Sequence, residues 1–278
     1  MIVVFHYFLA VVLSVLTTIF GGLCNSWIDF YIPILLFIGY LLGGFLVSLI
    51  LMFITAIPIK VKSDFCEKHS KFYRFIFDNA LELVLYICRV KVILEGKEKI
   101  PQKGRFIIMS NHMSKFDCMV INKAFKGYDI SWVGKRSLFK MPFIGKIMHK
   151  ICCLPLDRDN VRQGLKVIKQ CAYYINEDMC SIAICPEGTR NNTEDILLPL
   201  KAGSMKMAYY SKAPILVVEC VNTEKIVKRS PFRRTRVYIK ISKVLEYEDF
   251  KDIDTTELAS LIEKEMRDVL VEQRKKKA

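Results

Sequence analysis

The chain has 278 residues, a formal net charge of +14 and ten cysteines. Its length suits one substantial α/β domain and does not require two soluble domains. The cysteines are scattered and form no Cys-x-x-Cys pair, which argues against a metal site or a disulfide framework and for reduced thiols. The sequence also lacks a Walker loop, a Gly-x-Gly-x-x-Gly fingerprint and a Gly-x-Ser-x-Gly elbow, so three common nucleotide-binding and hydrolase patterns are missing.

The N-terminal part of the chain is almost free of charge. Residues 1–59 hold no lysine or arginine and one acidic residue, Asp29, so residues 60–278 carry a net charge of +15. Two apolar runs, about 2–23 and 31–59, each reach the roughly 20 residues needed to cross a bilayer. A cleaved signal peptide is disfavoured because a basic n-region is missing and a second apolar run follows at once. We therefore predict a membrane helical hairpin over residues 1–62 and a second domain over residues 63–278.

The topology of this hairpin follows from the charges behind it. Lys60 and Lys62 end the second run, and the positive-inside rule then places the rest of the chain on the cytoplasmic face of the membrane. A hairpin that lies within one leaflet is the alternative, since Gly21-Gly22, Pro33 and Gly43-Gly44 would help it to bend. Either topology keeps the second domain at the lipid surface.

The second domain shows alternating helix and strand patterns. Residues 64–88 have apolar positions at helical spacing, which predicts a helix packed on the core or lying at the membrane interface. Strands are then predicted at Val90–Leu94, Arg105–Ser110, Ile130–Val133, Ser181–Cys185, Pro214–Val221 and Arg236–Ile241. Helices are predicted after Asn111, at Val161–Glu177, after Ala202 and at Thr255–Gln273. This order predicts an α/β fold with a mixed, mostly parallel sheet covered by helices.

The segment that follows the second predicted strand carries a candidate acid–base pair, His112 and Asp117. Positions five apart lie about 140° from each other on a helix, so the two side chains share no helical face. His112 is therefore expected on the turn, with Asp117 in the first helical turn reaching back to one ring nitrogen. The carboxylate would fix the tautomer and leave the other nitrogen free as a general base. A histidine near a helix start beside a surface carboxylate is the alternative for this pair taken alone.

A second candidate site follows the predicted strand Ser181–Cys185. Arg190 offers a fork of donors that matches phosphate oxygens, and Gly188 allows close approach of the backbone. Glu187 is suited to hold the arginine or a neighbouring cation, and Thr189 completes the set of candidate substrate-binding residues. An ion-paired turn is the alternative for this loop taken alone. It is disfavoured because the loop follows the histidine–aspartate motif in the same chain.

Together these motifs resemble the 1-acylglycerol-3-phosphate acyltransferase family, whose signature is Asn-His-x4-Asp, over most of residues 90 to 245. The resemblance implies that His112 deprotonates a glycerol hydroxyl, which attacks an acyl thioester directly, with Asp117 as the partner of the histidine. It also implies that Lys135 and Arg158 contact the acceptor phosphate. The chain departs from the family at Cys185, at Val217 and in residues 151–155, positions that concern the acyl pocket and the acceptor preference.

The expected activity is transfer of a fatty acyl group from an acyl thioester to the sn-2 hydroxyl of lysophosphatidic acid, giving phosphatidic acid. The resemblance implies acyl-CoA or an acyl carrier protein thioester as co-substrate, no further cofactor and no metal, and we expect no nucleic-acid partner. Another lysophospholipid acceptor, a lipid hydrolase and a non-catalytic protein bound to anionic membranes remain alternatives. Two basic clusters are candidate membrane contacts: Lys225, Lys228, Arg229, Arg233, Arg234 and Arg236, and the tail Arg274–Lys277.

Overall fold

The computed structural model describes residues 2–277, without the side chains of Ile2, Trp27, Ile28, Arg274, Lys276 and Lys277. Contacts within the chain divide it into two compact units, Met1–Lys60 and Val61–Ala278. The sequence predicted the boundary after residue 62. The tail Arg274–Lys277 belongs to the last helix, but apart from Lys275, which is exposed, its side chains lie outside the described residues.

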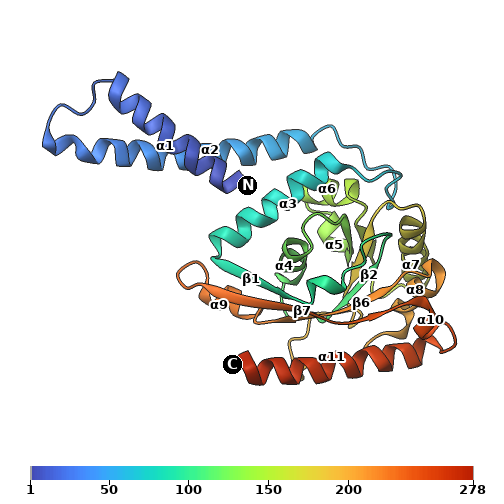
Figure 1. The fold of residues 1–278 in the computed structure, drawn as a ribbon. Helices are drawn as coiled ribbons and strands as arrows, with labels where there is room; N and C mark the ends of the chain where they lie inside the picture. The colour runs from blue at the N-terminus through green and yellow to red at the C-terminus, as the bar shows by residue number, and fades with distance from the viewer. Residues whose placement is uncertain (1, 278) are drawn as a thin grey trace. The chain divides into compact units, whose positions relative to one another are not determined.

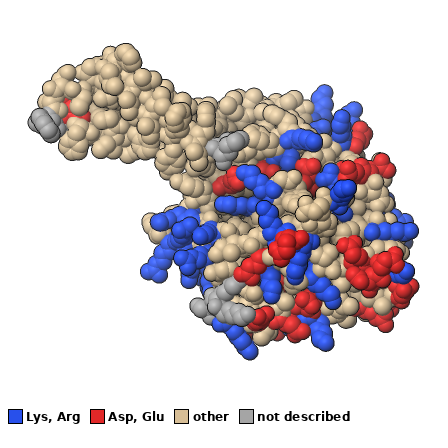
Figure 2. Space-filling view, viewed as in Figure 1, with Lys and Arg blue, Asp and Glu red and all other residues tan. Residues whose placement is uncertain are grey.

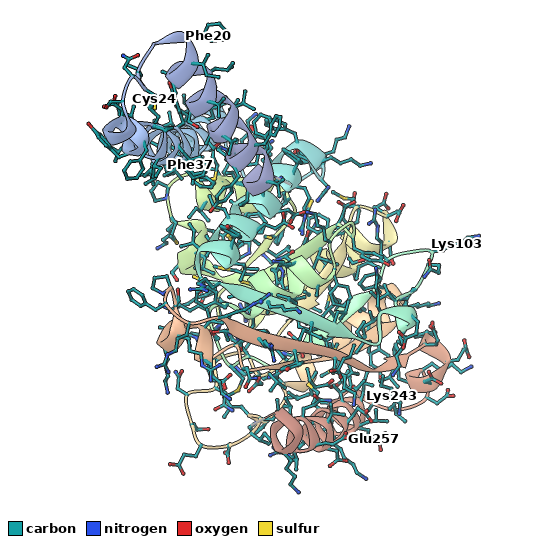
Figure 3. The ribbon with its side chains drawn as sticks, turned by 60° about the vertical axis from the view of Figure 1, so that its left-hand side comes forward. Phe20, Cys24, Phe37, Lys103, Lys243 and Glu257 are labelled. Carbon is teal, nitrogen blue, oxygen red and sulfur yellow. The ribbon has the colours of Figure 1, made fainter. Side chains whose placement is uncertain are left out.

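The first unit is a hairpin of two apolar helices, α1 (Ile2–Phe20) and α2 (Tyr31–Ala56), joined by a turn with the short helix η1 (Trp27–Phe30). Phe20 and Cys24 mark this turn in Figure 3. Both helices are long and apolar enough to cross a membrane, by length and composition. They form because long apolar runs satisfy all backbone groups internally as helices when no water is available.

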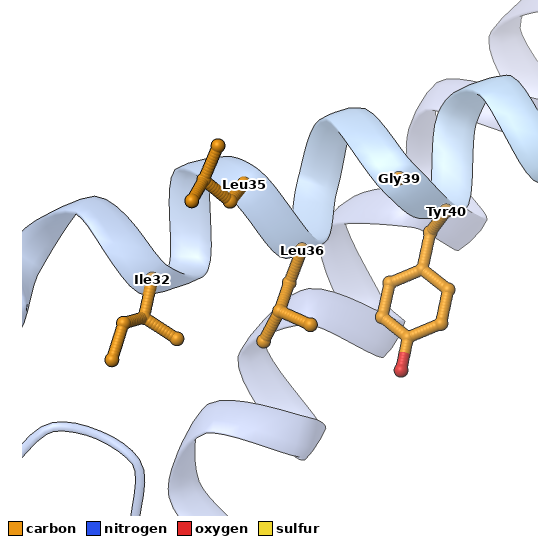
Figure 4. Close-up of a pocket in the computed structure, with 5 residues that line it drawn as sticks. All are labelled: Ile32, Leu35, Leu36, Gly39 and Tyr40. Atoms are coloured by element: carbon orange, nitrogen blue, oxygen red, sulfur yellow. The ribbon is translucent and has the colours of Figure 1, made fainter.

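Polar side chains inside the hairpin pair with each other across the two helices. A ring nitrogen of His6, Nε2, lies 2.8 Å from Ser48 Oγ, and the Thr17 hydroxyl lies 2.8 Å from that of Tyr40. Gly44 permits the close approach of His6, because a Cβ there would lie 2.8 Å from the imidazole ring. An open hollow of about 440 Å³ along α2 is lined by Ile32, Leu35, Leu36, Gly39 and Tyr40 (Figure 4). Its lining is mostly apolar.

The second unit is built on a seven-stranded sheet in the order β1-β7-β6-β2-β5-β3-β4 (Figure 1). The strands are β1 (Val90–Glu95), β2 (Ile107–Ser110), β3 (Ile130–Lys135), β4 (Leu154–Leu156), β5 (Ser181–Ile184), β6 (Ile215–Val221) and β7 (Thr235–Leu245). Strands β2 to β6 run parallel to one another, whereas β7 is antiparallel to β6 and parallel to β1. The carboxyl ends of five strands therefore meet at one edge of the sheet, where β1 and β7 begin.

Helices cover both faces of this sheet, and alternate residues of the central strands β2, β5 and β6 point into two separate cores. One core joins α7 (Val161–Asn176), α8 (Lys206–Ser211) and α11 (Thr255–Lys277) to strand residues such as Ile107. The other joins α3 (Lys71–Ile87), α4 (Asp117–Ala124) and α6 (Ile144–Lys150) to residues such as Ile108. Since side chains alternate along a strand, neighbours in sequence enter opposite cores. The predicted mixed, mostly parallel sheet covered by helices is confirmed.

Several short elements were not predicted, and the helices predicted over residues 2–23, 31–59 and 64–88 are each shorter than predicted. The short elements are β4, α5 (Arg136–Phe139), α6, α9 (Lys225–Arg229), α10 (Tyr247–Phe250) and the 3-10 turns η2 (Lys97–Lys99) and η3 (Ala202–Ser204). The helix predicted over 64–88 begins at Lys71, because the Ser70 hydroxyl accepts a hydrogen bond from the Tyr73 amide and caps the first turn.

Candidate active site

Asn111 fixes the point at which the chain leaves β2. Its side-chain amide nitrogen donates to the Cys220 carbonyl (3.1 Å), and its side-chain oxygen accepts from the Cys220 amide (2.7 Å). The backbone pairing of β2 with β6 ends at Ser110 and Val218. Beyond that pair, the Asn111 side chain takes over and makes the two hydrogen bonds to the backbone of Cys220 in β6. Asn111 is fully buried, and the next residue, His112, is thereby held at the carboxyl edge of the sheet.

Asp117 folds the following loop back onto the histidine. One carboxylate oxygen, Oδ2, accepts from the amides of Met113 (2.8 Å) and Ser114 (2.7 Å) and lies 2.8 Å from Nδ1 of His112. Because an ionised carboxylate only accepts, Nδ1 is the nitrogen that carries the proton in the neutral imidazole, and Nε2 is then the one with the lone pair. The Asp117 side chain is 1% exposed and that of His112 is 22% exposed. This geometry suits a general base whose free nitrogen faces substrate.

The loop after β5 (Ser181–Ile184) holds the backbone of the same histidine from both sides. The carboxylate of Glu187 accepts the His112 amide (2.5 Å) through one oxygen and the Leu198 amide (3.0 Å) through the other. The amide of Asn191 donates to the His112 carbonyl (2.7 Å). The pKa of Glu187 is raised above its ordinary value, because the effect of burial exceeds the opposing effect of the two amide donors. Glu187 therefore contacts backbone amides, rather than Arg190 or another cation as the sequence suggested.

Arg190 lies in the loop after β5, directly before Asn191, whose amide donates to the His112 carbonyl. Its Nε is buried and has no hydrogen-bond partner among the described residues, and no ion pair involves its guanidinium within residues 2–277. A buried donor of a cation is costly when unpaired. The unpaired guanidinium therefore suits a ligand that brings an anion.

Gly188 makes room for a second cation, which the sequence-based selection of site residues missed. The backbone of Gly188 has φ +72°, and a Cβ there would lie 2.8 to 3.0 Å from the end of the Lys201 side chain. The Lys201 amide also donates to the Pro186 carbonyl (2.9 Å). Lys201 therefore crosses the loop that carries Arg190. Its place directly before the helix predicted after Ala202 is the sequence signal that could have indicated it.

The other predicted phosphate contacts lie further along the same edge. Lys135 ends β3 and Arg158 follows β4, and both are exposed, as is Thr189. In the order β2-β5-β3-β4, a strand spacing of about 4.8 Å puts Lys135 roughly 10 Å and Arg158 roughly 14 Å along the sheet from His112. Within residues 2–277 no group of three His, Cys, Asp or Glu side chains is arranged to hold a metal ion.

The chain is similar to known proteins. The Acyltransferase family matches residues 91–221, and with the histidine–aspartate pair this defines the class of the protein as an acyltransferase. The chain is 30% identical to the 1-acyl-sn-glycerol-3-phosphate acyltransferase of Haemophilus influenzae over 171 residues, which are 60% of this chain and 70% of that one. It is 29% identical to the enzyme of the same name from Bacillus subtilis, over 66% of this chain and 89% of that one.

The chain belongs to the 1-acyl-sn-glycerol-3-phosphate acyltransferase family. Its fold is similar to the crystal structure of the 1-acyl-sn-glycerophosphate acyltransferase PlsC from Thermotoga maritima, with a TM-score of 0.57 and 20% sequence identity. The match covers 84% of this chain and 88% of that one. The sequence resemblance to this family is thereby confirmed.

Proposed function

We propose that the protein is a membrane-bound enzyme that transfers an acyl group from a thioester to the sn-2 hydroxyl of lysophosphatidic acid, giving phosphatidic acid. The contact between His112 Nδ1 and Asp117 Oδ2 carries the proposal, because it leaves Nε2 free to act as a base. Arg190, whose Nε is buried and unpaired, lies at the same edge of the sheet. The names of the family relatives support lysophosphatidic acid as acceptor.

In the proposed reaction a single group, the imidazole of His112, both accepts and returns the proton. Nε2 of His112 takes the proton of the acceptor hydroxyl as its oxygen attacks the thioester carbonyl. The tetrahedral intermediate then collapses, the carbon–sulfur bond breaks, and the imidazolium returns the proton to the leaving thiolate. Asp117 stabilises the imidazolium, and general-base help of this kind contributes about 10²–10⁴-fold in rate. No covalent acyl-enzyme and no cofactor beyond acyl-CoA or an acyl carrier protein thioester is required.

Arg190 is proposed to clamp the acceptor phosphate, with Lys201, Lys135 and Arg158 as further cations along the edge. Binding energy from the phosphate then positions a hydroxyl that lies remote from it. Arginine suits this role because its planar fork binds two phosphate oxygens at once.

The hairpin of α1 and α2 supports attachment to a membrane. Lys60 and Lys62, which follow α2, support a catalytic domain on the cytoplasmic face.

Acceptor selectivity tests the clamp. We expect Arg190→Ala to reduce kcat/KM with lysophosphatidic acid by about 10²-fold, since a charged hydrogen-bonded contact is worth about 1.5–3 kcal/mol. The loss with lysophosphatidylcholine, which has a larger headgroup, should be smaller. Lys264→Ala, which removes an exposed cation on α11, is the control and should change neither value. Equal losses on both acceptors would refute a phosphate-specific clamp, and release of free fatty acid without a new ester would indicate hydrolysis.

A further inference from the structure

The segment Lys225–Arg236 begins with α9 after β6 and ends on the first two residues of β7. It forms an exposed basic stretch, called the basic loop below, that the proposed chemistry does not use. It holds six basic residues, and Glu224, just before it, is the nearest acidic residue in the chain. Lys228, Arg229, Arg233, Arg234 and Arg236 are exposed. In the part of the chain that the structure describes, none of these side chains forms an ion pair. Figure 2 shows lysine and arginine side chains gathered over α9, at the start of this loop.

The basic loop also presents large apolar side chains to solvent. Phe232 is 85% exposed and Val227 is 66% exposed. The end of α3 adds Tyr86 and Ile87, which are both exposed. An exposed aromatic side chain among cations suits a lipid interface, where the ring enters the acyl boundary and the cations stay at the headgroups.

Arg89 joins the end of α3 to the basic loop. One guanidinium nitrogen of Arg89, Nη1, donates to the Phe232 carbonyl (3.0 Å), and the Thr235 amide donates to the Arg89 carbonyl (3.2 Å). Val90, the first residue of β1, then pairs with Thr235, the first residue of β7. The exposed side chains of the two segments therefore form one surface.

This surface lies at the same edge of the sheet as the candidate active site. The basic loop follows the carboxyl end of β6, and β6 runs parallel to β2, which leads into His112. Asn111, next to His112, is hydrogen-bonded to Cys220 of β6. A flat partner seated on the basic loop would thus lie at the same edge of the sheet as His112.

We propose that the basic loop and the end of α3 dock the catalytic domain on an anionic lipid bilayer, with Phe232 and Val227 entering the interface. The inference rests on the proposed function, because docking at this edge presents the site to a lipid acceptor. Charge complementarity and the exposed phenyl ring favour a bilayer as the occupant. Each basic residue strengthens attraction to anionic headgroups, and the attraction falls with added salt.

A tryptophan placed at the tip of the loop tests the proposal in the full chain. Phe232→Trp is reconstituted in vesicles of brominated phosphatidylcholine, with or without brominated phosphatidylglycerol, and its fluorescence is compared with that of wild type, which retains Trp27 and Trp132. Lys103→Trp is the matched control, since Lys103 is exposed and precedes β2 at the opposite edge of the sheet (Figure 3). We expect bromolipid quenching at position 232 in the anionic vesicles, and none at position 103 beyond the wild-type signal.

Charge reversal separates the docking surface from other effects. Adding Arg229→Glu, Arg233→Glu and Arg234→Glu to Phe232→Trp should abolish the extra quenching and raise KM for lysophosphatidic acid in anionic vesicles about tenfold. Equal quenching at positions 232 and 103, or quenching at position 232 that survives the charge reversal, would overturn the proposal. If reversal leaves quenching intact but raises KM for an acyl carrier protein thioester in detergent, the loop docks that acidic protein instead.

A separate assay, without vesicles, tests the proposed function independently of docking. Wild type in detergent micelles must form phosphatidic acid whether or not position 232 contacts lipid. If wild type forms none there, the proposed function fails while the quenching result stands on its own.

Discussion

Replacing Glu187 by glutamine distinguishes between two roles for this side chain. The sequence suggests a residue that binds substrate or holds a cation, whereas the structure shows a carboxylate that bridges two backbone amides, those of His112 and Leu198. Glutamine keeps the length of the side chain but offers only one acceptor oxygen. Its NH₂ group must then face one of the two amide donors, so the backbone of His112 or the chain at Leu198 loses its partner.

The size of the effect follows from these contacts. Glu187 is 2% exposed, and an unsatisfied buried donor costs about 1–3 kcal/mol. If the loss falls on His112, its imidazole shifts relative to the acceptor hydroxyl, and a displacement of about 1 Å costs about 10²-fold in rate. We therefore expect kcat to fall about 10- to 100-fold in Glu187→Gln while KM for lysophosphatidic acid changes less than about twofold.

Steady-state kinetics of phosphatidic acid formation measures both constants. Glu177→Gln makes the same chemical change at an exposed position at the end of α7 and should behave as wild type. The unfolding transition of each variant shows whether lost activity reflects lost fold. A large rise in KM with unchanged kcat would refute the positioning role and restore Glu187 as a substrate-binding residue.

Two further predictions concern stability, measured as the free energy of unfolding by urea in detergent. Gly188→Ala should lower the free energy of unfolding by about 1–3 kcal/mol, because alanine is strained at φ +72° and its Cβ would lie against the Lys201 side chain. Adding Lys201→Ala to this variant should recover only the part of the loss that is due to the contact with Lys201. Full recovery would show that the backbone at position 188 is not strained. Burial raises the pKa of Glu219 from 4.5 to about 8, so the native state keeps a proton that the unfolded state has lost, and stability should fall as pH rises between these values. Glu219→Gln should lack this fall, which is on the order of several kcal/mol, and a wild-type stability that rises with pH relative to the variant would contradict the reasoning.

The sequence predicts the histidine–aspartate pair because its geometry is local. Four residues separate His112 and Asp117, so the two side chains share no helical face and can meet when His112 lies on the turn before the helix. The observed contact of 2.8 Å has this form. Likewise, alternation of strands and helices sets the fold class, because a parallel sheet needs helices on both faces.

The contacts of Glu187 escape sequence reasoning because they are long-range and end on backbone atoms. The partner amide of His112 is 75 positions away, and it comes within reach only because β5 lies beside β2 in the sheet. From the charges in the sequence alone, a nearby cation is the expected partner of Glu187. Once the carboxylate is buried, however, any donors that satisfy both of its oxygens are suitable partners, including backbone amides. Similarly, β4 has only three residues, Leu154–Leu156, too few to show a period of their own.

His112 is proposed to act as the base for acyl transfer to lysophosphatidic acid. The most direct measurement is phosphatidic acid formation from lysophosphatidic acid and an acyl thioester by purified wild type and His112→Ala in detergent, with lysophosphatidylglycerol and lysophosphatidylcholine as parallel acceptors. We expect wild type to form phosphatidic acid preferentially and the variant to retain less than about a hundredth of that activity. Near-normal activity of His112→Ala would contradict the mechanism, and preference for another lysolipid would contradict the proposed acceptor.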